Sequence, residues 1–343
     1  MPSTEDNIMH RFTLALLMTM SIPLAARGDA KPPLKAGIIG LDTSHVVAFT
    51  KTLNNPKAKG VLARVRVVAA YPGGSSDIPA SKDRLQGFTE QLRDKYHVEI
   101  VDSIDALLQK VDVVFLESVD GRPHLKQVKP VFKAKKPVFI DKPVAGSLAD
   151  AVEIYRLAKE SGTPCFSSSS LRFSPGILGA RTDAKLGGVL GCDAYGPCHI
   201  EPHHPDLFWY GIHGVEALFT IMGLGCESVT RVETDNTEFV TGKWKNGRVG
   251  TFRGIRKGKA DYGAMVFGEK KVGPAGGFGS YEPLVVEICK FFESGKAPVT
   301  AEETLEIYAF MEAADESKRQ GGKPVTLASV LARARAKTSA KKR

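Results

Sequence analysis

The chain has 343 residues, 43% of them hydrophobic and 25% charged, which is typical of a globular protein with more than one core. Much of its net charge of +9 lies in residues 331–343, which carry six Lys or Arg and no acid. We interpret this segment as a basic tail, solvated and frayed. Since no basic stripe interleaved with aromatic residues occurs elsewhere, we predict no nucleic-acid partner.

The N-terminus has the three parts of a secretory signal. Arg11 precedes an apolar run at residues 12–26, and the small residues Gly28 and Ala30 follow at the spacing that a signal peptidase reads. The run is too short to span a membrane comfortably. We therefore predict a signal peptide at residues 1–30, export to the periplasm or the medium, and no membrane partner after cleavage.

The five cysteines include no Cys-x-x-Cys pair, which excludes a zinc ribbon or a disulfide scaffold. Cys192 and Cys198 either pair across a turn, as an exported chain permits, or remain buried free thiols. The sequence leaves both possibilities open.

Residues 34–168 alternate between strand and helix patterns. Such alternation specifies parallel βαβ units with right-handed crossovers, as in a Rossmann-type doubly wound sheet. The predicted strands are residues 36–40, 65–71, 98–101, 112–116, 138–140 and 164–168, and the predicted helices are residues 46–53, 82–96, 104–108, 123–134 and 147–161.

Residues 169–327 contain mainly strand patterns. Asn246-Gly247 is a strong hairpin signal, and Thr300 with Glu303 forms a capping box at the start of the last of two closing helices. We expect an α/β chain whose C-terminal domain carries a largely antiparallel open sheet. Its predicted strands are residues 198–203, 228–233, 237–244, 248–255 and 264–268.

The buried strand at residues 138–140 ends in Asp141-Lys142-Pro143. In an open parallel sheet, ligands bind beyond the carboxyl ends of the strands. Pro143 fixes its own φ and restricts that of Lys142. We therefore predict that Lys142 directs a cation into the binding crevice.

Four segments resemble, in order, motifs of the Gfo/Idh/MocA oxidoreductase family: residues 118–124, residues 141–143, residues 172–175 and the segment around His213. The resemblance covers residues 34–327. It implies a Rossmann domain at residues 34–168, a C-terminal substrate and oligomerisation domain at residues 169–327, and NAD or NADP bound between them.

The dinucleotide fingerprint departs from the family pattern. Where Gly-x-Gly-x-x-Gly is expected, residues 40–45 read Gly-Leu-Asp-Thr-Ser-His. Asp42 brings a carboxylate towards the pyrophosphate, and two charges about 4 Å apart repel by about 1 kcal/mol in water and about 4 kcal/mol near a protein surface. Asp42, Thr43 or Ser44 is instead expected to cap the following helix.

The resemblance still implies a set of cofactor contacts. Tyr71 is a candidate to stack on adenine, but no acid follows its strand to bind a ribose hydroxyl, so NAD versus NADP stays open. An exported enzyme has no cytoplasmic cofactor pool, so the cofactor would be tightly bound. The implied contacts are Gly40, Leu41, Asp42, Thr43, Tyr71, Ser118, His124, Asp141 and Lys142.

The resemblance also implies a catalytic pair, Lys142 and His213. One would accept the hydroxyl proton while the other stabilises the developing alkoxide, in either order. Trp209 stands where family members often have an aspartate. Asp206, seven residues before His213, suits the same helix face.

His199, Glu201 and His203 alternate, so on a strand they would share one face. We interpret them as a substrate-binding strip together with Arg172, Trp209 and Tyr210. They are also a competent ligand set for a divalent metal.

The sequence therefore predicts an NAD(P)-dependent oxidoreductase for a small carbohydrate or polyol-like substrate. One alternative is a non-redox carbohydrate-binding protein that lost its cofactor. The other is a metal-dependent lyase or hydrolase built on the strip at His199, Glu201 and His203. A homo-oligomer formed through the second sheet is expected from the resemblance.

Overall fold

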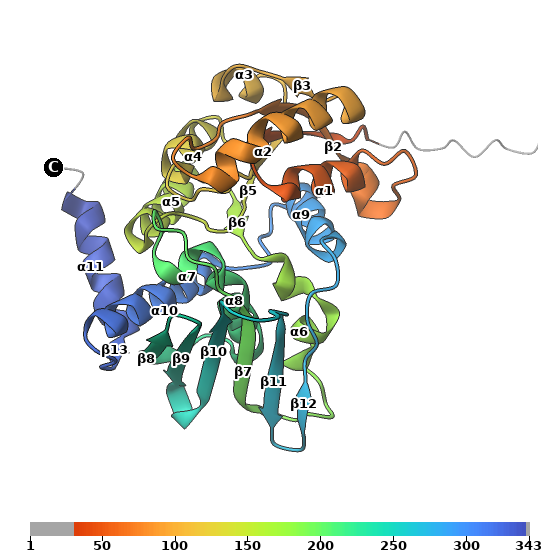
Figure 1. Ribbon diagram of the computed structural model, residues 1–343. Helices are drawn as coiled ribbons and strands as arrows, with labels where there is room; N and C mark the ends of the chain where they lie inside the picture. The colour runs from red at the N-terminus through yellow and green to blue at the C-terminus, as the bar shows by residue number, and fades with distance from the viewer. Residues whose placement is uncertain (1–30, 341–343) are drawn as a thin grey trace, which may run out of the picture. The chain divides into compact units, whose positions relative to one another are not determined.

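The computed structural model describes residues 31–340, of which residues 33–340 form one compact unit (Figure 1). The segment predicted as a signal peptide, residues 1–30, lies outside the described residues. Within the described part, every helix is too short or too polar to cross a membrane.

The first half of the chain forms a six-stranded parallel sheet of order β3-β2-β1-β4-β5-β6. This is the doubly wound order of dinucleotide-binding sheets, as predicted. Its strands are β1 (Leu34–Ile39), β2 (Val65–Tyr71), β3 (Glu99–Ile100), β4 (Val113–Leu116), β5 (Val138–Ile140) and β6 (Cys165–Ser167). The connecting helices are α1 (Ser44–Leu53), α2 (Pro79–Glu90), α3 (Ile104–Leu108), α4 (His124–Lys133) and α5 (Leu148–Ser161).

Both faces of this sheet are covered, so the central strands β4 and β5 are uninterrupted apolar runs with every residue buried. One covering helix, α9 (Glu282–Ser294), comes from the end of the chain and lies beside α1. Its Phe291 and Phe292 pack edge-on against Phe166 and Phe115. The C-terminal half is therefore anchored to the parallel sheet by aromatic packing.

The second half forms a seven-stranded sheet of order β12-β11-β7-β10-β9-β8-β13. Only β7 and β10 pair in parallel, so the sheet is largely antiparallel as predicted. Its strands are β7 (Val189–Pro197), β8 (Cys226–Thr234), β9 (Thr237–Trp244), β10 (Val249–Ile255), β11 (Gly263–Gly268), β12 (Val272–Pro274) and β13 (Val325–Thr326). The helices of this half are α6 (Pro175–Ala180), α7 (Asp206–Trp209), α8 (Gly211–Met222), α10 (Ala301–Arg319) and α11 (Leu327–Ala340).

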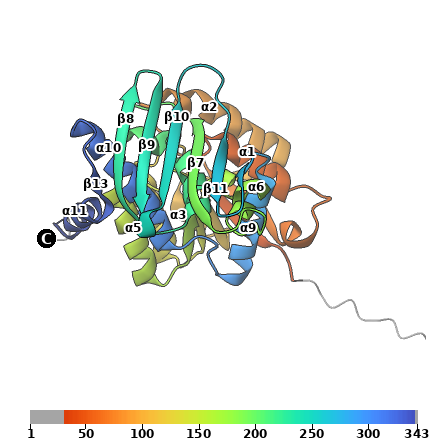
Figure 2. The same cartoon turned by 90° about the horizontal axis from the view of Figure 1, so that it is seen from below.

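Helix α8 packs on β7 and β10 with all of its residues buried, while Figure 2 looks onto the opposite face of the sheet, which no helix covers. The predicted hairpin connects β9 to β10, and Asn246 and Gly247 adopt the positive φ values, 65° and 76°, that its turn requires.

Two sequence expectations differ from the structure. The strand predicted at residues 198–203 is wrong: β7 ends at Pro197, and residues 198–205, which include two prolines, form a loop. The terminus expected to fray is helical as far as residue 340, because Ala334 and Thr338 are buried where α11 packs against α5 and α10.

All five cysteines are free thiols, four of them buried, so Cys192 and Cys198 do not pair. Burial raises the pKa of Cys192 and of Cys198 to about 12. Both are therefore thiols rather than thiolates at neutral pH.

Of the predicted capping box at α10, the structure shows one bond: the Thr300 hydroxyl accepts the backbone N–H of Glu303 at 3.1 Å, while the Glu303 carboxylate pairs with Arg172. Replacing Thr300 by Ala should lower the free energy of unfolding by about 1 kcal/mol, because that N–H loses its acceptor. Urea unfolding at neutral pH measures the change. Thr300→Ser keeps the oxygen and should behave as wild type, whereas equal stability of Thr300→Ala and wild type would contradict the assignment.

Candidate active site

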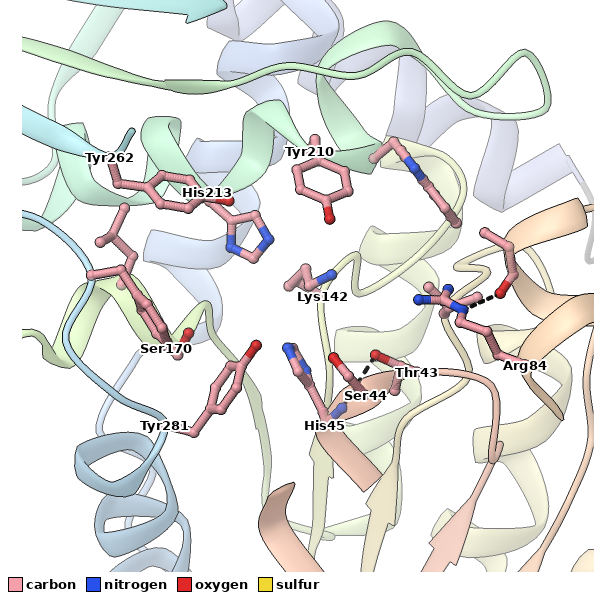
Figure 3. Close-up of a pocket in the computed structure, with 15 residues that line it drawn as sticks. Thr43, Ser44, His45, Arg84, Lys142, Ser170, Tyr210, His213, Tyr262 and Tyr281 are labelled. Carbon is pink, nitrogen blue, oxygen red and sulfur yellow. Dashed lines mark hydrogen bonds between the residues drawn. The ribbon is translucent and has the colours of Figure 1, made fainter. Parts of the chain in front are cut away.

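A cavity of about 200 Å³ lies beyond the carboxyl ends of β1 and β5 and contains residues from both halves of the chain. Figure 3 shows its polar and aromatic lining, with Tyr210, His213 and Tyr262 on one side, His45 and Tyr281 on the other, and Lys142 between them. The cavity therefore brings together strand-end residues of the parallel sheet and helix residues of the second half.

Lys142 is placed by β5, as predicted, and its side chain is buried in the cavity wall. Its ammonium lies 6.0 Å from the centre of the Tyr210 ring. Burial lowers the pKa of Lys142, the carboxylate of Asp141 opposes that change, and the cation of Arg84 adds to it. Lys142 is thus a lysine that gives up its proton more easily than a solvated one.

His213 lies in the first turn of α8, where the rings of Tyr210 and Tyr262 contact it edge-on at 5.8 and 5.7 Å. Its Nδ1 is 2.7 Å from the Ser169 hydroxyl. Burial holds the pKa of His213 well below the ordinary value of 6.5, and the positive charge of Lys142 lowers it further. At neutral pH its imidazole is uncharged.

His45, at the start of α1, is a second imidazole in the cavity. Its Nδ1 is 2.7 Å from Oδ2 of Asp141, and its ring stacks on Phe49 and meets Tyr281 edge-on. Burial by itself would raise the pKa of Asp141, but the neighbouring His45 and Lys142 leave it below its usual value. Asp141 is therefore ionised, with the His45 imidazole and the Lys142 ammonium as its neighbours.

Glu117, at the end of β4, is fully buried beside Asp141. Burial raises its pKa well above the usual value, and the charge of Asp141 raises it further. Glu117 is accordingly the neutral member of this pair of carboxyl groups.

The loop after β1 is closed by its own contacts. Gly40 has φ 89°, and a Cβ there would lie 2.4 Å from the Ser118 nitrogen, so only glycine fits. Asp42 accepts hydrogen bonds from Ser81 Oγ at 2.6 Å and Val119 N–H at 2.9 Å, and burial raises its pKa. Its carboxyl group links the loop after β1 to the first turn of α2 and to the loop after β4.

Of the residues considered as caps for α1, Thr43 has that role, since its hydroxyl accepts the His45 N–H at 3.5 Å. Thr43 also lines the cavity.

The other predicted cofactor contacts serve packing. His124 lies buried between the carbonyls of Ser118 and Val144, and burial lowers its pKa. Leu41 and Tyr71 pack in the cores on the two faces of the sheet. Neither these residues nor Ser118 line the cavity.

Two residues expected near the substrate are held elsewhere by ion pairs. Arg172 is buried against Glu216 at 2.7 Å and Glu303 at 2.8 Å. Asp206 pairs with Arg231 at 2.7 Å, and the chain breaks its helical course at Tyr210, between α7 and α8. Asp206 and His213 therefore do not share a helix face, contrary to the sequence interpretation.

The predicted polar strip is a loop, so its three residues do not share one strand face. His199 is exposed and contacts Tyr210 edge-on, while Glu201 accepts from His203 at 2.6 Å. Trp209 and Tyr210, from the same set, do line the cavity.

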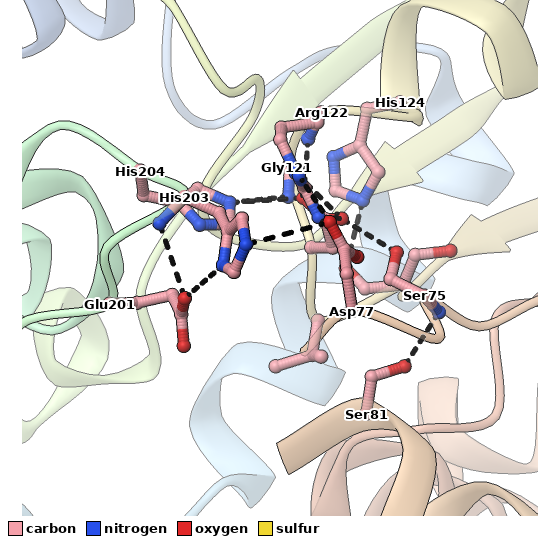
Figure 4. A network of polar contacts seen from close by, with 12 residues as sticks. Ser75, Asp77, Ser81, Gly121, Arg122, His124, Glu201, His203 and His204 are labelled. Carbon is pink, nitrogen blue, oxygen red and sulfur yellow. Dashed lines mark hydrogen bonds and ion pairs between the residues drawn. The ribbon is translucent and has the colours of Figure 1, made fainter. Parts of the chain in front are cut away.

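Figure 4 shows that this loop belongs to a network between the two halves. The Arg122 guanidinium binds Asp77 and Asp120, and the pKa of Asp77 is lowered by its hydrogen bonds to Arg122. His203 and His204 from the second half reach Asp77 at 3.7 Å and Asp120 at 3.1 Å. The loops after β2 and β4 are thus tied to the loop after β7.

The described residues contain one close group of possible metal ligands, Asp206, Glu233 and Glu238. The buried guanidinium of Arg231 contacts all three, so their negative charge is already compensated. The predicted strip does not provide a metal site.

Sequence reasoning missed several cavity residues. His45 is the last residue of the segment that replaces the dinucleotide fingerprint after β1. Since β1 and β5 belong to one parallel sheet, the position of both residues after a strand could have indicated that His45 lies near Lys142. The others come from loops or helices without a motif: Arg84, Ser170, Tyr262 and Tyr281.

The cavity lining fits the phosphate and nicotinamide end of a dinucleotide. The N-terminus of α1, at Thr43 and Ser44, opens into it opposite the Arg84 cation, an arrangement that suits a phosphate. The volume of about 200 Å³ is below the roughly 300–1,000 Å³ of small-molecule sites. A complete dinucleotide is larger than this cavity and would extend beyond it.

Strand order and cavity position define a dinucleotide-binding type of α/β protein. Residues 35–169 match the Gfo/Idh/MocA family, described as an oxidoreductase family with an NAD-binding Rossmann fold. The parallel-sheet domain of this chain is therefore similar to the Rossmann domain of the Gfo/Idh/MocA family.

Two curated relatives come from Escherichia coli K12. The uncharacterised oxidoreductase YhhX is 25% identical over 139 residues, which are 37% of this chain and 40% of that protein. The 2,7-anhydro-N-acetylneuraminate hydratase is 33% identical over 100 residues, which are 27% of this chain and 26% of that protein. The matched parts thus span less than half of either relative.

Solved structures extend the similarity to the whole fold. Myo-inositol 2-dehydrogenase from Lactobacillus plantarum superposes with a TM-score of 0.71 at 16% identity, covering 86% of this chain and 99% of that one. Scyllo-inositol dehydrogenase from Lactobacillus casei, solved with NAD(H) and scyllo-inositol, gives 0.70 at 14% identity, with 86% and 99% coverage. At these identities the similarity establishes the fold alone.

Removal of the Lys142 charge should raise the pKa of His213 towards 6.5, because that charge is one cause of its depression. NMR titration of labelled imidazoles in wild type and Lys142→Met measures the shift. In the wild type, His213 should stay neutral as the pH falls through about 6.5, the ordinary histidine value. Lys51→Met, at an exposed site on α1, is the control, and an ordinary titration of wild-type His213 would contradict the prediction.

Proposed function

We propose that this protein is an NAD(P)-dependent oxidoreductase acting on a carbohydrate or polyol-like alcohol. The observation that carries the proposal is the meeting of Lys142 and His213, from different halves of the chain, in one cavity at the carboxyl edge of the parallel sheet. Aromatic side chains of Trp209, Tyr210 and Tyr262 provide apolar surfaces for the C–H faces of a sugar ring.

In alcohol oxidation, different residues of the cavity would have different roles. The Lys142 ammonium and the neutral His213 imidazole would hold the reacting oxygen and stabilise negative charge that develops on it. A bound nicotinamide supplies the hydride acceptor or donor. The tyrosine rings and the buried wall exclude water from the reacting carbon.

The proposed export bears on the cofactor. The segment at residues 1–30 has the pattern of a secretory signal, and an exported enzyme meets no cytoplasmic nucleotide pool. We therefore propose that the nucleotide is retained through the catalytic cycle. Separation of the Figure 4 network, and its re-formation over the nucleotide, would achieve such retention.

The same network supports a second candidate, a non-redox carbohydrate-binding protein. The Asp42 carboxyl joins the loop after β1 to α2 and to the loop after β4, and Arg122, Asp77 and His203 form contacts between the two halves. A protein in which these contacts persist would use the cavity for a sugar alone. The metal-dependent alternative is not retained, because His199, Glu201 and His203 do not form a ligand set.

Nucleotide content distinguishes the two candidates. We expect purified protein, once denatured, to release NAD(H) or NADP(H) in close to equimolar amount, measured by chromatography and absorbance. Emptied protein should rebind that nucleotide in calorimetric titration. No release, and no binding at millimolar NAD⁺ or NADP⁺, would contradict the oxidoreductase proposal and favour the sugar-binding protein.

If nucleotide binds, Lys142→Met should lower kcat by at least about 100-fold, because the developing alkoxide loses its cation. Nucleotide titration should change little, since the proposed role of Lys142 concerns the reacting oxygen. Turnover is followed by nicotinamide absorbance with myo-inositol and D-glucose as probes. Full activity of Lys142→Met would contradict its role.

The uncovered sheet face supports a proposed homo-oligomer. Tyr195, Met265 and Phe267 expose 38–40% of their surface there (Figure 2). Light scattering after size-exclusion chromatography should report an oligomer for the wild type and a smaller species for Phe267→Asp. Leu178→Asp, at an exposed apolar position on α6 outside the sheet, should not change the size. A monomeric wild type would contradict the proposal.

A further inference from the structure

We propose that His45, oriented by Asp141, is the base that takes the substrate's hydroxyl proton, and that His213 instead donates a hydrogen bond to the same oxygen. This inference rests on the proposed oxidoreductase function and assigns the proton-transfer residue within it. His45 stands at a position where the dinucleotide fingerprint has glycine. The departure from that fingerprint is therefore what places an imidazole in the cavity.

The tautomer of His45 follows from its partner. An ionised carboxylate only accepts hydrogen bonds, so the contact of 2.7 Å with Asp141 requires a hydrogen on Nδ1 of His45. The other ring nitrogen, Nε2, then has a free lone pair. In a catalytic His–Asp pair, the carboxylate holds the imidazole in this tautomer and stabilises the imidazolium that forms.

The tautomer of His213 is the opposite. The Ser169 hydroxyl oxygen already accepts the backbone N–H of Leu171 at 3.1 Å. Among the described residues, Nδ1 of His213, 2.7 Å away, is the one acceptor with which the Ser169 hydroxyl hydrogen makes a contact, and we assign that hydrogen to it. Nδ1 is then an acceptor and Nε2–H a donor, so this imidazole can bind an oxyanion but has no lone pair to offer the substrate.

The charges near the two imidazoles also favour His45, and not His213, as the residue that accepts a proton. A proton on His45 is compensated by Asp141, whose pKa is held low by its neighbours despite burial. A proton on His213 would lie in a buried site that has Lys142 and His45 as cationic neighbours, and the pKa of His213 is depressed accordingly. Of the two, His45 is the imidazole whose ring nitrogen contacts a carboxylate, whereas the ring of His213 contacts a hydroxyl.

The charged and titratable groups near His45 come from several elements. Asp141 at the end of β5 is its partner, and Lys142 and Arg84 are cations that line the same cavity. His213 on α8 and Tyr281 ahead of α9 also face this cavity.

The step balances with the proposed cofactor. The hydroxyl proton of the substrate would pass to Nε2 of His45. The carbon that bears this hydroxyl would give up its hydride, for which a bound nicotinamide is the acceptor, and its C–O bond would become a double bond. Lys142 and the Nε2–H of His213 stabilise the oxygen as its O–H bond breaks. The proton then leaves His45 through the cavity opening to solvent, and reduction runs through the same positions in reverse.

Imidazole nitrogen NMR tests the tautomers without any turnover. In ¹⁵N-labelled wild type at neutral pH, we expect His45 to carry hydrogen on Nδ1 only and His213 on Nε2 only. Spectra of His45→Asn and His213→Asn assign the signals. The reverse pattern, with an unprotonated Nε2 on His213, would overturn the assignment of the base.

Kinetics tests the role. His45→Asn keeps an N–H group where Nδ1 met Asp141 but lacks the Nε2 base, so the contact with Asp141 is preserved. With NAD⁺ or NADP⁺ and myo-inositol or D-glucose, we expect kcat to fall at least about 100-fold and the acidic limb of the pH profile of kcat/KM to disappear. His213→Asn should lower kcat but retain that limb, and Lys51→Met should leave both unchanged.

Two outcomes separate failure of this inference from failure of the proposed function. If His45→Asn keeps wild-type kcat and acidic limb, or if His213→Asn loses that limb, the base is not His45 although the oxidoreductase function stands. If the wild type binds no nucleotide, the oxidoreductase function fails, and with it the proton-transfer role of His45. The NMR measurement still establishes whether the His45–Asp141 pair has the tautomer described.

Discussion

The buried carboxylate of Asp141 is the charge around which the cavity is organised. It sits at the end of β5, next to Lys142 in sequence and 2.7 Å from His45 in space. An isolated carboxylate at this depth would be costly, and the contacts with His45 and Lys142 keep it ionised. The position of each partner therefore depends on the others, and substitution of Asp141 would alter both the base and the oxyanion site.

The site also depends on the joining of the two halves. Helix α9 returns from the C-terminal half to pack aromatic side chains against the parallel sheet, and α8 presents His213 to the ends of β1 and β5. The network around Arg122 ties the same halves together on the side where the adenosine of a dinucleotide would lie. The structure thus combines a cavity lined by polar and aromatic side chains with loops that are tied together beside it.

The sequence predicted those strands, turns and helix starts that depend on residues close together along the chain. Buried β-branched runs identified β2, β4 and β5, the Asn246-Gly247 turn identified a hairpin, and Thr300 identified a helix start. Strand β7 was missed because its glycines weaken the strand pattern, and the loop after it was mistaken for a strand because its polar residues alternate. This segment contains two prolines, which have no backbone N–H to donate to a neighbouring strand, so its alternating polar residues do not make it a strand.

What the sequence by itself determined was the fold class and the position of Lys142 at the end of a strand, because these follow from periodicity, turn chemistry and residues adjacent along the chain. Only the tertiary structure decided which side chains share the cavity. Arg172 and Asp206 form ion pairs with residues far from them in sequence, and Asp42 accepts a hydrogen bond from Ser81 on α2. His45 lies in the cavity, where it contacts Asp141. Such partners are separated by many residues in sequence, and the pairing of buried charges is settled only when the sheets and helices are assembled.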